Sequence, residues 1–310
     1  MAGFKAKIIL YLLRHRYVLK GKLRQKDFEQ SVEAVLKFRE TCEQGGERFG
    51  KLPANVMIKQ EIINLVRTEW IVPDHAPNQM LLFYVHGGGY VSGSCNDHRS
   101  IVSKLTMKTG ITAILYEYGL APEHPYPAAL EDSISTYREI LKKGYKPENI
   151  VVVGESAGGG LALALLLALR DKNIGLPKAA VAISPWTDLS CSASSYKIKG
   201  KVSLAPPNSW NVFSHFYVGK YDVNDPYISP LNGNMEGLPP IFINAGDADE
   251  LFDDGLMFYE KAKGAGVDIT FRNGKGMVHC YPLMAPLFKE ATEALDEIAE
   301  FIKLKLIPLR

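Results

Sequence analysis

The stretch I-V-V-V-G-E-S-A-G-G-G-L at residues 150–161 decides the fold. Its first four residues are a β-branched run typical of a buried strand, and the apolar run beyond residue 157 is typical of a helix. The G-x-S-x-G between them fits a tight strand-to-helix turn, where larger flanking side chains would collide. Ser156 would then lie at a helix N-terminus, whose free N–H groups favour a developing oxyanion. The stretch therefore predicts a nucleophilic serine held by an α/β sheet.

The rest of the chain repeats the alternation of strand and helix patterns. The predicted strands are residues 56–63, 67–72, 80–85, 112–118, 150–153, 179–184, 240–245 and 267–272. The predicted helices between the later strands are residues 98–109, 128–143, 157–171, 252–264 and 286–305. This alternation indicates a mainly parallel sheet covered on both faces. The first two strands are joined by a short turn, which predicts an antiparallel hairpin.

A serine nucleophile needs a histidine base and an orienting acid, in the chain order serine, acid, histidine. Two histidines follow Ser156 in the chain. His215 lies in a long aromatic connection, whereas His279 follows the last predicted strand, so His279 is the expected base. Asp247 and Asp249 both lie at the carboxyl end of the seventh strand, where catalytic groups gather. Position alone does not separate these two acids.

A second motif, H-G-G-G-Y at residues 86–90, follows the third predicted strand. Consecutive glycines let the backbone approach a ligand closely, as the oxyanion loop of lipases and esterases does. We expect the N–H groups of Gly88 and Gly89, in preference to Gly87, to bind an oxyanion together with that of Ala157. A phosphate-binding loop is excluded, because no Gly-Lys pair is followed by Ser or Thr and no G-x-G-x-x-G follows a strand.

Composition excludes several other classes of protein. With 46% hydrophobic and 23% charged residues, the 310-residue chain is neither disordered nor a disulfide scaffold. Residues 1–26 hold eight basic residues and no acid, which leaves 28 basic and 34 acidic residues in the remainder. The body is therefore mildly acidic, and no nucleic-acid partner is expected. Four dispersed cysteines and the lack of H-E-x-x-H predict no metal and no cofactor.

The basic N-terminal segment admits three interpretations. Residues 4–20 have apolar positions at helical spacing with basic residues between them, and residues 26–43 form a second helical pattern. The first helix could be a cap over the active site, a membrane-surface anchor or a solvated tail, and the cap is favoured. The apolar run at 8–13 lacks a cleavage site, and the run at 161–169 is too short to cross a bilayer. A cytoplasmic protein is expected, and a membrane partner is disfavoured.

Together these motifs resemble the hormone-sensitive-lipase-like family of α/β-hydrolases, the bacterial carboxylesterases in particular. The stretch Y-G-L-A-P-E-H-P-Y-P-A-A-L-E-D at residues 118–132 is similar to the family's Y-R-L-A-P-E-H-P-F-P-A-A-L-E-D. The segments S-P-W at 184–186 and D-P-Y-I-S-P-L at 225–231 also resemble the family. Its acid motif, D-P-L-x-D-x-G, counted back from Gly255, implies Asp249 as the acid. Two departures from the family pattern are Glu155, in place of an aspartate, and Gly119, in place of an arginine.

The resemblance implies an α/β-hydrolase fold with an eight-stranded, mostly parallel sheet flanked by helices. Residues 1–45 would supply N-terminal cap helices, and residues 187–236 would form a cap insertion. The catalytic domain would then comprise residues 46–186 and 237–310. An exposed last strand would also allow pairing in a homodimer.

The expected activity is that of a serine carboxylesterase acting on short- to medium-chain esters. It would pass through an acyl-enzyme at Ser156, with Asp249 and His279 completing the triad. A small-molecule ester is therefore the expected partner. Two alternatives remain open at this stage. An amidase or peptidase could use the same triad, and a non-catalytic small-molecule binder could share the fold.

Overall fold

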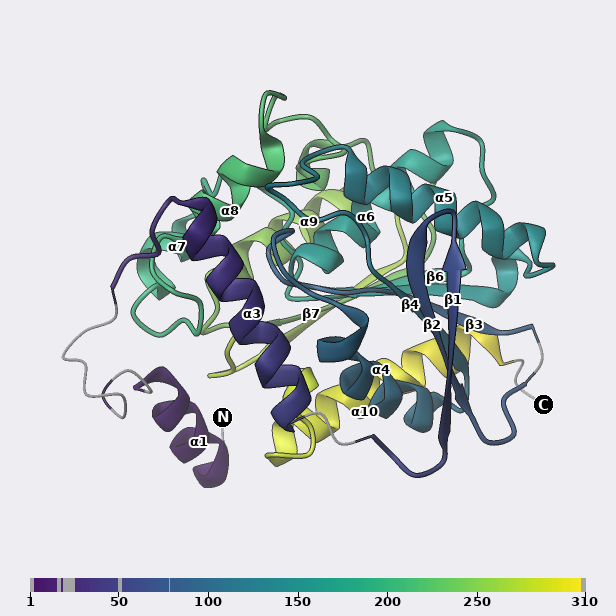
Figure 1. Ribbon diagram of the computed structural model, residues 1–310, viewed down its shortest axis with the longest axis horizontal. Coiled ribbons are helices and arrows are strands. Elements are labelled where there is room, and N and C mark those ends of the chain that lie inside the picture. The colour runs from purple at the N-terminus through teal and green to yellow at the C-terminus, as the bar shows by residue number, and fades with distance from the viewer. Residues whose placement is uncertain (1–2, 16–17, 19–25, 50–51, 78, 308–310) are drawn as a thin grey trace.

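The computed structural model describes residues 3–15, 18, 26–49, 52–77 and 79–307, and its centre is one sheet of eight strands (Figure 1). The strands lie in the order β1-β2-β4-β3-β5-β6-β7-β8. Their bounds are β1 Val56–Ile63, β2 Val66–Pro73, β3 Leu81–Val85, β4 Thr112–Tyr116, β5 Ile150–Glu155, β6 Ala179–Ile183, β7 Ile241–Gly246 and β8 Ile269–Gly274. All eight predicted strands are present, with each end within two residues of its predicted place.

Strand direction sets the first two strands apart from the others. β1 and β2 pair antiparallel, from Val56 opposite Pro73 to Ile63 opposite Val66, so the predicted hairpin is confirmed. β2 is also antiparallel to β4, and the pairs from β4 through β8 are all parallel. The predicted fold class is therefore confirmed. Because the carboxyl ends of parallel strands meet at one edge, the residues after β3, β5 and β7 come together.

Helices cover both faces of the sheet. In β3, Leu81, Phe83 and Val85 belong to one apolar core, while Leu82 and Tyr84 belong to the other. The first core lies under α5, α6 and α9, and the second lies under α4 and α10 (Figure 1). The bounds of these helices are α4 Cys95–Thr109, α5 Ala128–Lys142, α6 Ala157–Asp171, α9 Phe252–Gly264 and α10 Lys289–Leu306.

The N-terminal helices differ from the sequence prediction in their ends. α1 spans Phe4–Arg14 and is shorter than the predicted helix at 4–20, of which residues 16, 17, 19 and 20 lie outside the described part. α3 spans Val32–Phe49 and begins six residues later than predicted. The side chain of Ser31 accepts a hydrogen bond in its first turn, which fixes that start. No helix of the described residues is both long and apolar enough to cross a membrane.

The long connection between β6 and β7 contains two short helices, α7 (Ser194–Lys199) and α8 (Ser209–Val218). α8 meets the N-terminal segment through three aromatic rings. The centroid of Phe213 lies 5.0 Å from that of Phe28 and 5.1 Å from that of Phe38, which belongs to α3. Two segments far apart in the sequence thus lie side by side above the carboxyl edge of the sheet (Figure 1).

Candidate active site

Ser156 lies in the turn between β5 and α6 with a strained backbone, at φ 57° and ψ −125°. Few non-glycine residues adopt this region, and such strain is concentrated at functional sites. The turn is tightly enclosed, because a Cβ at Gly158 would lie 2.2 Å from the carbonyl oxygen of His86. The backbone carbonyl of Ser156 accepts hydrogen bonds from Gly160 and Trp186. The turn therefore presents the serine hydroxyl beyond the end of the sheet.

The structure brings Ser156, His279 and Asp249 into one hydrogen-bonded chain. Nε2 of His279 lies 2.9 Å from Oγ of Ser156, and Nδ1 lies 2.8 Å from Oδ2 of Asp249. Asp249 is fully buried, and Ser156 is 6% exposed. Asp247 points elsewhere, because its Oδ1 accepts the N–H of Gly276 at 2.6 Å. His215 is exposed on α8 and takes no part in this chain.

The charge state of His279 is governed by its neighbours. Burial alone would lower the pKa of His279, but the Asp249 carboxylate and, after it, Cys280 together raise that pKa well above its ordinary value. This shift has two chemical consequences. The imidazolium is stabilised once it forms, and the neutral base is available only on the alkaline side of its ordinary range.

The glycine loop after β3 lies against the serine turn. Gly88 and Gly89 have φ angles of 116° and 66°, which glycine adopts at no steric cost. The N–H of Gly87 is already engaged, donating to Oε1 of Glu155 at 2.6 Å. Among the described residues, no group accepts a hydrogen bond from the N–H of Gly88, Gly89 or Ala157. These three donors are therefore available for a ligand oxygen.

A buried ionic network behind the glycine loop was not found from the sequence. Nε2 of His98 lies 2.9 Å from Oε1 of Glu155, the same oxygen that accepts the N–H of Gly87. Nδ1 of His98 contacts the Asp97 carboxylate on the other side. Burial would lower the pKa of His98, but Glu155 and Asp97 together raise it well above its ordinary value. The Glu155 carboxylate thus ties the serine turn to the glycine loop and to α4.

The helix that carries His98 begins three residues earlier than predicted. Ser94 and Asp97 form a capping box, in which the Ser94 hydroxyl accepts two backbone N–H groups and Asp97 accepts the N–H of Ser94. This pattern is a recognisable helix-start signal, so it could have been found in the sequence. Its partner Glu155 lies 57 residues further along the chain and carried no such signal.

Two aromatic side chains of α8 lie against His279 and the glycine loop. The ring of Trp210 lies 5.5 Å from that of His279, and its Nε1 donates to Oε2 of Glu250 at 2.9 Å. Burial raises the pKa of Glu250, while the Trp210 hydrogen bond opposes that rise. Phe213 lies so close to the glycine loop that a Cβ at Gly89 would be 2.4 Å from its ring. Phe213 and Trp210 therefore form an aromatic wall beside the glycine loop and His279.

Cys280 and Ser156 both contact the same ring nitrogen of His279. Its Sγ lies 3.4 Å from Nε2 of His279, whereas Oγ of Ser156 lies 2.9 Å from the same atom. Burial raises the pKa of the Cys280 thiol, and the neighbouring imidazole only partly offsets the rise. The thiolate is therefore disfavoured, and the serine has the closer contact with the base.

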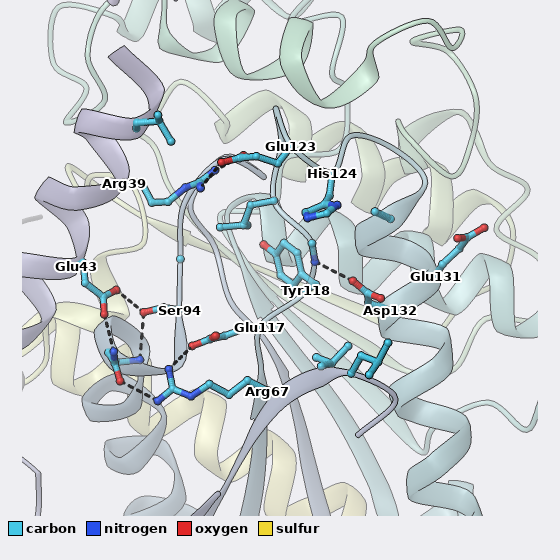
Figure 2. Close-up of a pocket in the computed structure, with 18 of the residues that line it drawn as sticks. Arg39, Glu43, Arg67, Ser94, Glu117, Tyr118, Glu123, His124, Glu131 and Asp132 are labelled. Atoms are coloured by element: carbon cyan, nitrogen blue, oxygen red, sulfur yellow. Dashed lines mark hydrogen bonds and ion pairs between the residues drawn. The ribbon is translucent and has the colours of Figure 1, made fainter. Parts of the chain in front are cut away.

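A separate polar cleft of about 1050 Å³ lies between α3, the start of β2 and the start of α5 (Figure 2). Its lining includes none of the three residues of the Ser156 chain. Gly119 lies in this cleft, and its N–H donates to Oδ2 of Asp132 at 2.8 Å. Two ion pairs join charged side chains of the lining, Arg67 with Glu117 at 2.9 Å and Arg39 with Glu123 at 2.8 Å. The described residues contain no cluster of three metal-ligating side chains.

Arg39 of α3 joins that helix to the body of the protein at the rim of the cleft. Its guanidinium forms two hydrogen bonds with the Glu123 carboxylate, at 2.9 and 2.8 Å. It also donates to the carbonyl oxygens of Val91 and Ala121, at 2.9 and 3.0 Å. Because Val91 follows the glycine loop by two residues, Arg39 connects α3 to the segment that holds the loop (Figure 2).

Comparison with known proteins identifies the family to which this chain belongs. The family model of the α/β-hydrolase fold matches residues 82–283. The chain therefore belongs to the α/β-hydrolase family. An acetyl-hydrolase from Streptomyces hygroscopicus is 35% identical over 261 residues, which cover 83% of this chain and 86% of that protein.

Similarity to solved structures identifies the type of α/β-hydrolase more closely. An esterase/lipase from an uncultured bacterium is 32% identical, with a TM-score of 0.89 over 99% of this chain and all of that one. An esterase described as a member of the bacterial hormone-sensitive lipase family is 30% identical, with a TM-score of 0.88 over 99% of each chain. Within the α/β-hydrolases, the chain is a carboxylic ester hydrolase of the hormone-sensitive-lipase-like type.

Proposed function

We propose that this protein hydrolyses short- to medium-chain carboxylic esters through an acyl-enzyme formed on Ser156. The observation that carries the proposal is the continuous chain from Ser156 through His279 to Asp249, with both contacts below 3.0 Å. The similarity to an acetyl-hydrolase supports a short acyl group. The aromatic wall formed by Phe213 and Trp210 supports the same preference, because it limits the space beside the glycine loop.

In the first half of the reaction, Oγ of Ser156 attacks the ester carbonyl while Nε2 of His279 takes its proton. Asp249 keeps the proton on Nδ1 and stabilises the imidazolium. The carbonyl oxygen becomes an oxyanion and accepts hydrogen bonds from the N–H groups of Gly88, Gly89 and Ala157. His279 then protonates the departing alcohol, and the acyl group remains on the serine oxygen.

In the second half, water takes the place of the alcohol. His279 removes a proton from the water, which attacks the acyl carbonyl through the same oxyanion geometry. Collapse of this intermediate releases the carboxylic acid and returns the proton to Oγ of Ser156. No step needs a group from outside the chain other than water and the ester.

We also propose that α3 and the insertion at residues 187–236 act as a cap over the serine. The contacts among Phe28, Phe38 and Phe213 support this arrangement, because they join the two segments above the glycine loop. The four hydrogen bonds of Arg39 would hold the cap in place. A cap of this kind excludes water from the acyl-enzyme and shapes the space for the acyl chain.

The test compares Ser156→Ala with Cys280→Ala on p-nitrophenyl esters of increasing chain length. Ser156→Ala is expected to lose hydrolysis while retaining its fold by circular dichroism, and Cys280→Ala is expected to keep most of its activity. The matching p-nitroanilides distinguish an esterase from an amidase. Full activity of Ser156→Ala, or loss of activity only in Cys280→Ala, would refute the proposed nucleophile.

A further inference from the structure

One side of α1 exposes a stripe of apolar side chains to solvent. Phe4 is 81% exposed, Ile8 45%, Tyr11 61% and Leu12 49%. These positions are spaced by four, three and one residues, so they lie on one side of the helix. Surface apolar residues are ordinary when scattered, but a contiguous stripe on one helix face indicates a contact surface.

The opposite side of α1 is fixed to the protein. Ala6 and Leu10 are buried in the same apolar core as Tyr281 and Phe288. The N–H of Gly3 also donates to the Glu290 carboxylate at the start of α10. The helix is therefore anchored on its inner side, and the outer stripe is not a face that the described part of the body covers (Figure 1).

Basic residues border the stripe on both edges. On a helix with 3.6 residues per turn, Lys5 follows Leu12 around the circumference, and Lys7 lies beyond Tyr11 on the other edge. Both lysines are exposed, and neither forms an ion pair with another described residue. An apolar stripe between lysines is the pattern of a helix lying in a membrane interface, where the lysine ammonium groups reach lipid phosphates.

The charge of the N-terminal segment favours one kind of partner for the exposed stripe of α1. Residues 1–26 carry eight basic residues and no acid, while the rest of the chain is net acidic. A second copy of the chain seated on α1 across a two-fold axis would bring two such basic segments together. An anionic bilayer would attract the same segment, because each basic residue near such a surface strengthens binding. We propose that α1 docks this protein on the surface of an anionic lipid membrane.

The apolar core that holds α1 also contains a residue close in sequence to His279. Tyr281, which shares a core with Leu10 of α1, follows His279 by two residues. This core extends from Ile71 of β2 to Phe242 of β7, so it fixes α1 to the body of the protein without making the helix part of the site. The docking surface itself does not rest on the proposed function, because none of the α1 residues belongs to the Ser156 chain.

The experiment is co-sedimentation of the full chain with vesicles. One set contains equal parts phosphatidylglycerol and phosphatidylcholine, and the other contains phosphatidylcholine alone. The wild-type protein is expected to pellet with the anionic vesicles and less at higher salt. Phe4→Ser/Ile8→Ser and Lys5→Glu/Lys7→Glu are each expected to weaken that binding about ten-fold or more.

Two controls separate docking from general effects. Leu65→Ser removes an apolar side chain that is 97% exposed in the turn between β1 and β2, and it is expected to leave vesicle binding unchanged. Hydrolysis of a water-soluble p-nitrophenyl ester is expected to be unchanged in both α1 variants, which shows that they fold. Failure of the wild type to bind anionic vesicles would overturn the proposal. So would equal binding by the α1 variants, or conversion of a dimer to a monomer by Phe4→Ser/Ile8→Ser.

Discussion

Replacing His98 by alanine would leave the Glu155 carboxylate buried without its cation. Glu155 is 2% exposed, and Oε1 is the atom that accepts both His98 Nε2 and the N–H of Gly87. The Asp97 carboxylate would lose the same partner. The variant therefore tests whether this network supports the fold and the glycine loop.

The expected loss of stability is large for a single substitution. Removing one partner of a buried ion pair typically costs about 3–5 kcal/mol, because the remaining charge is left uncompensated. For a chain of this size, roughly 2 °C of melting temperature is lost per kcal/mol, so His98→Ala should melt about 6–10 °C lower. The value of kcat should also fall, by about ten- to a hundred-fold, because the glycine loop loses its support.

The effect should depend on pH in a defined direction. Because the folded protein raises the pKa of His98, the charged pair contributes fully below the unfolded pKa of about 6.5. That contribution is lost as the pH rises through the higher pKa of the folded state. The stability difference between the wild type and His98→Ala should therefore be larger at pH 6 than at pH 9.

Thermal and urea unfolding at these two pH values provide the assay. His124→Ala is the matched control, because His124 is exposed at the rim of the polar cleft, and its removal should change stability by no more than about 0.5 kcal/mol. A melting temperature for His98→Ala within about 2 °C of the wild type would refute the reasoning. A stability difference that is the same at both pH values would refute the charged state of His98.

Three further predictions concern the serine site. Asp249→Asn should lower kcat by about 10⁴-fold, whereas Asp247→Asn should leave most activity. If steady-state assays show the larger loss in Asp247→Asn, Asp247 rather than Asp249 is the acid that orients His279. Gly88→Ala should lower kcat by at least about 10²-fold or prevent folding, because the new Cβ would lie 2.1 Å from the Ser92 carbonyl oxygen. A folded Gly88→Ala variant with the kcat of the wild type would contradict this geometry. The raised pKa of His279 should place the acid limb of kcat/KM above pH 6.5, because only the neutral imidazole accepts the serine proton, and a limb at or below that value would be inconsistent with it.

Local patterns were sufficient to predict the elements that hold the site. The run at residues 150–161 specifies a strand, a tight turn and a helix by short-range rules, and the structure contains all three. Asp247 and Asp249 are two residues apart after the same strand, so local rules could not separate them. Which of the two carboxylates reaches His279 depends on how the backbone turns after β7, and only the family resemblance favoured Asp249 beforehand.

Contacts between distant segments were the part that the sequence could not supply. His98 lies among polar residues on an ordinary helix pattern, and its partner Glu155 is 57 residues away. The contact between Phe28 and Phe213 has the same character, because the two rings are 185 residues apart in the sequence and meet only in the folded chain. The start of α3 was predicted too early, since the helical periodicity of its apolar residues did not register the cap at Ser31.

Covalent labelling tests the central claim most directly. Treatment of the full chain with a fluorophosphonate, followed by peptide mass spectrometry, reports which side chain is an activated nucleophile. We expect one phosphonyl group per chain, located on Ser156, and no labelling of the Ser156→Ala variant. A label on Cys280 or on another residue, or no label at all on a folded wild-type protein, would contradict the account.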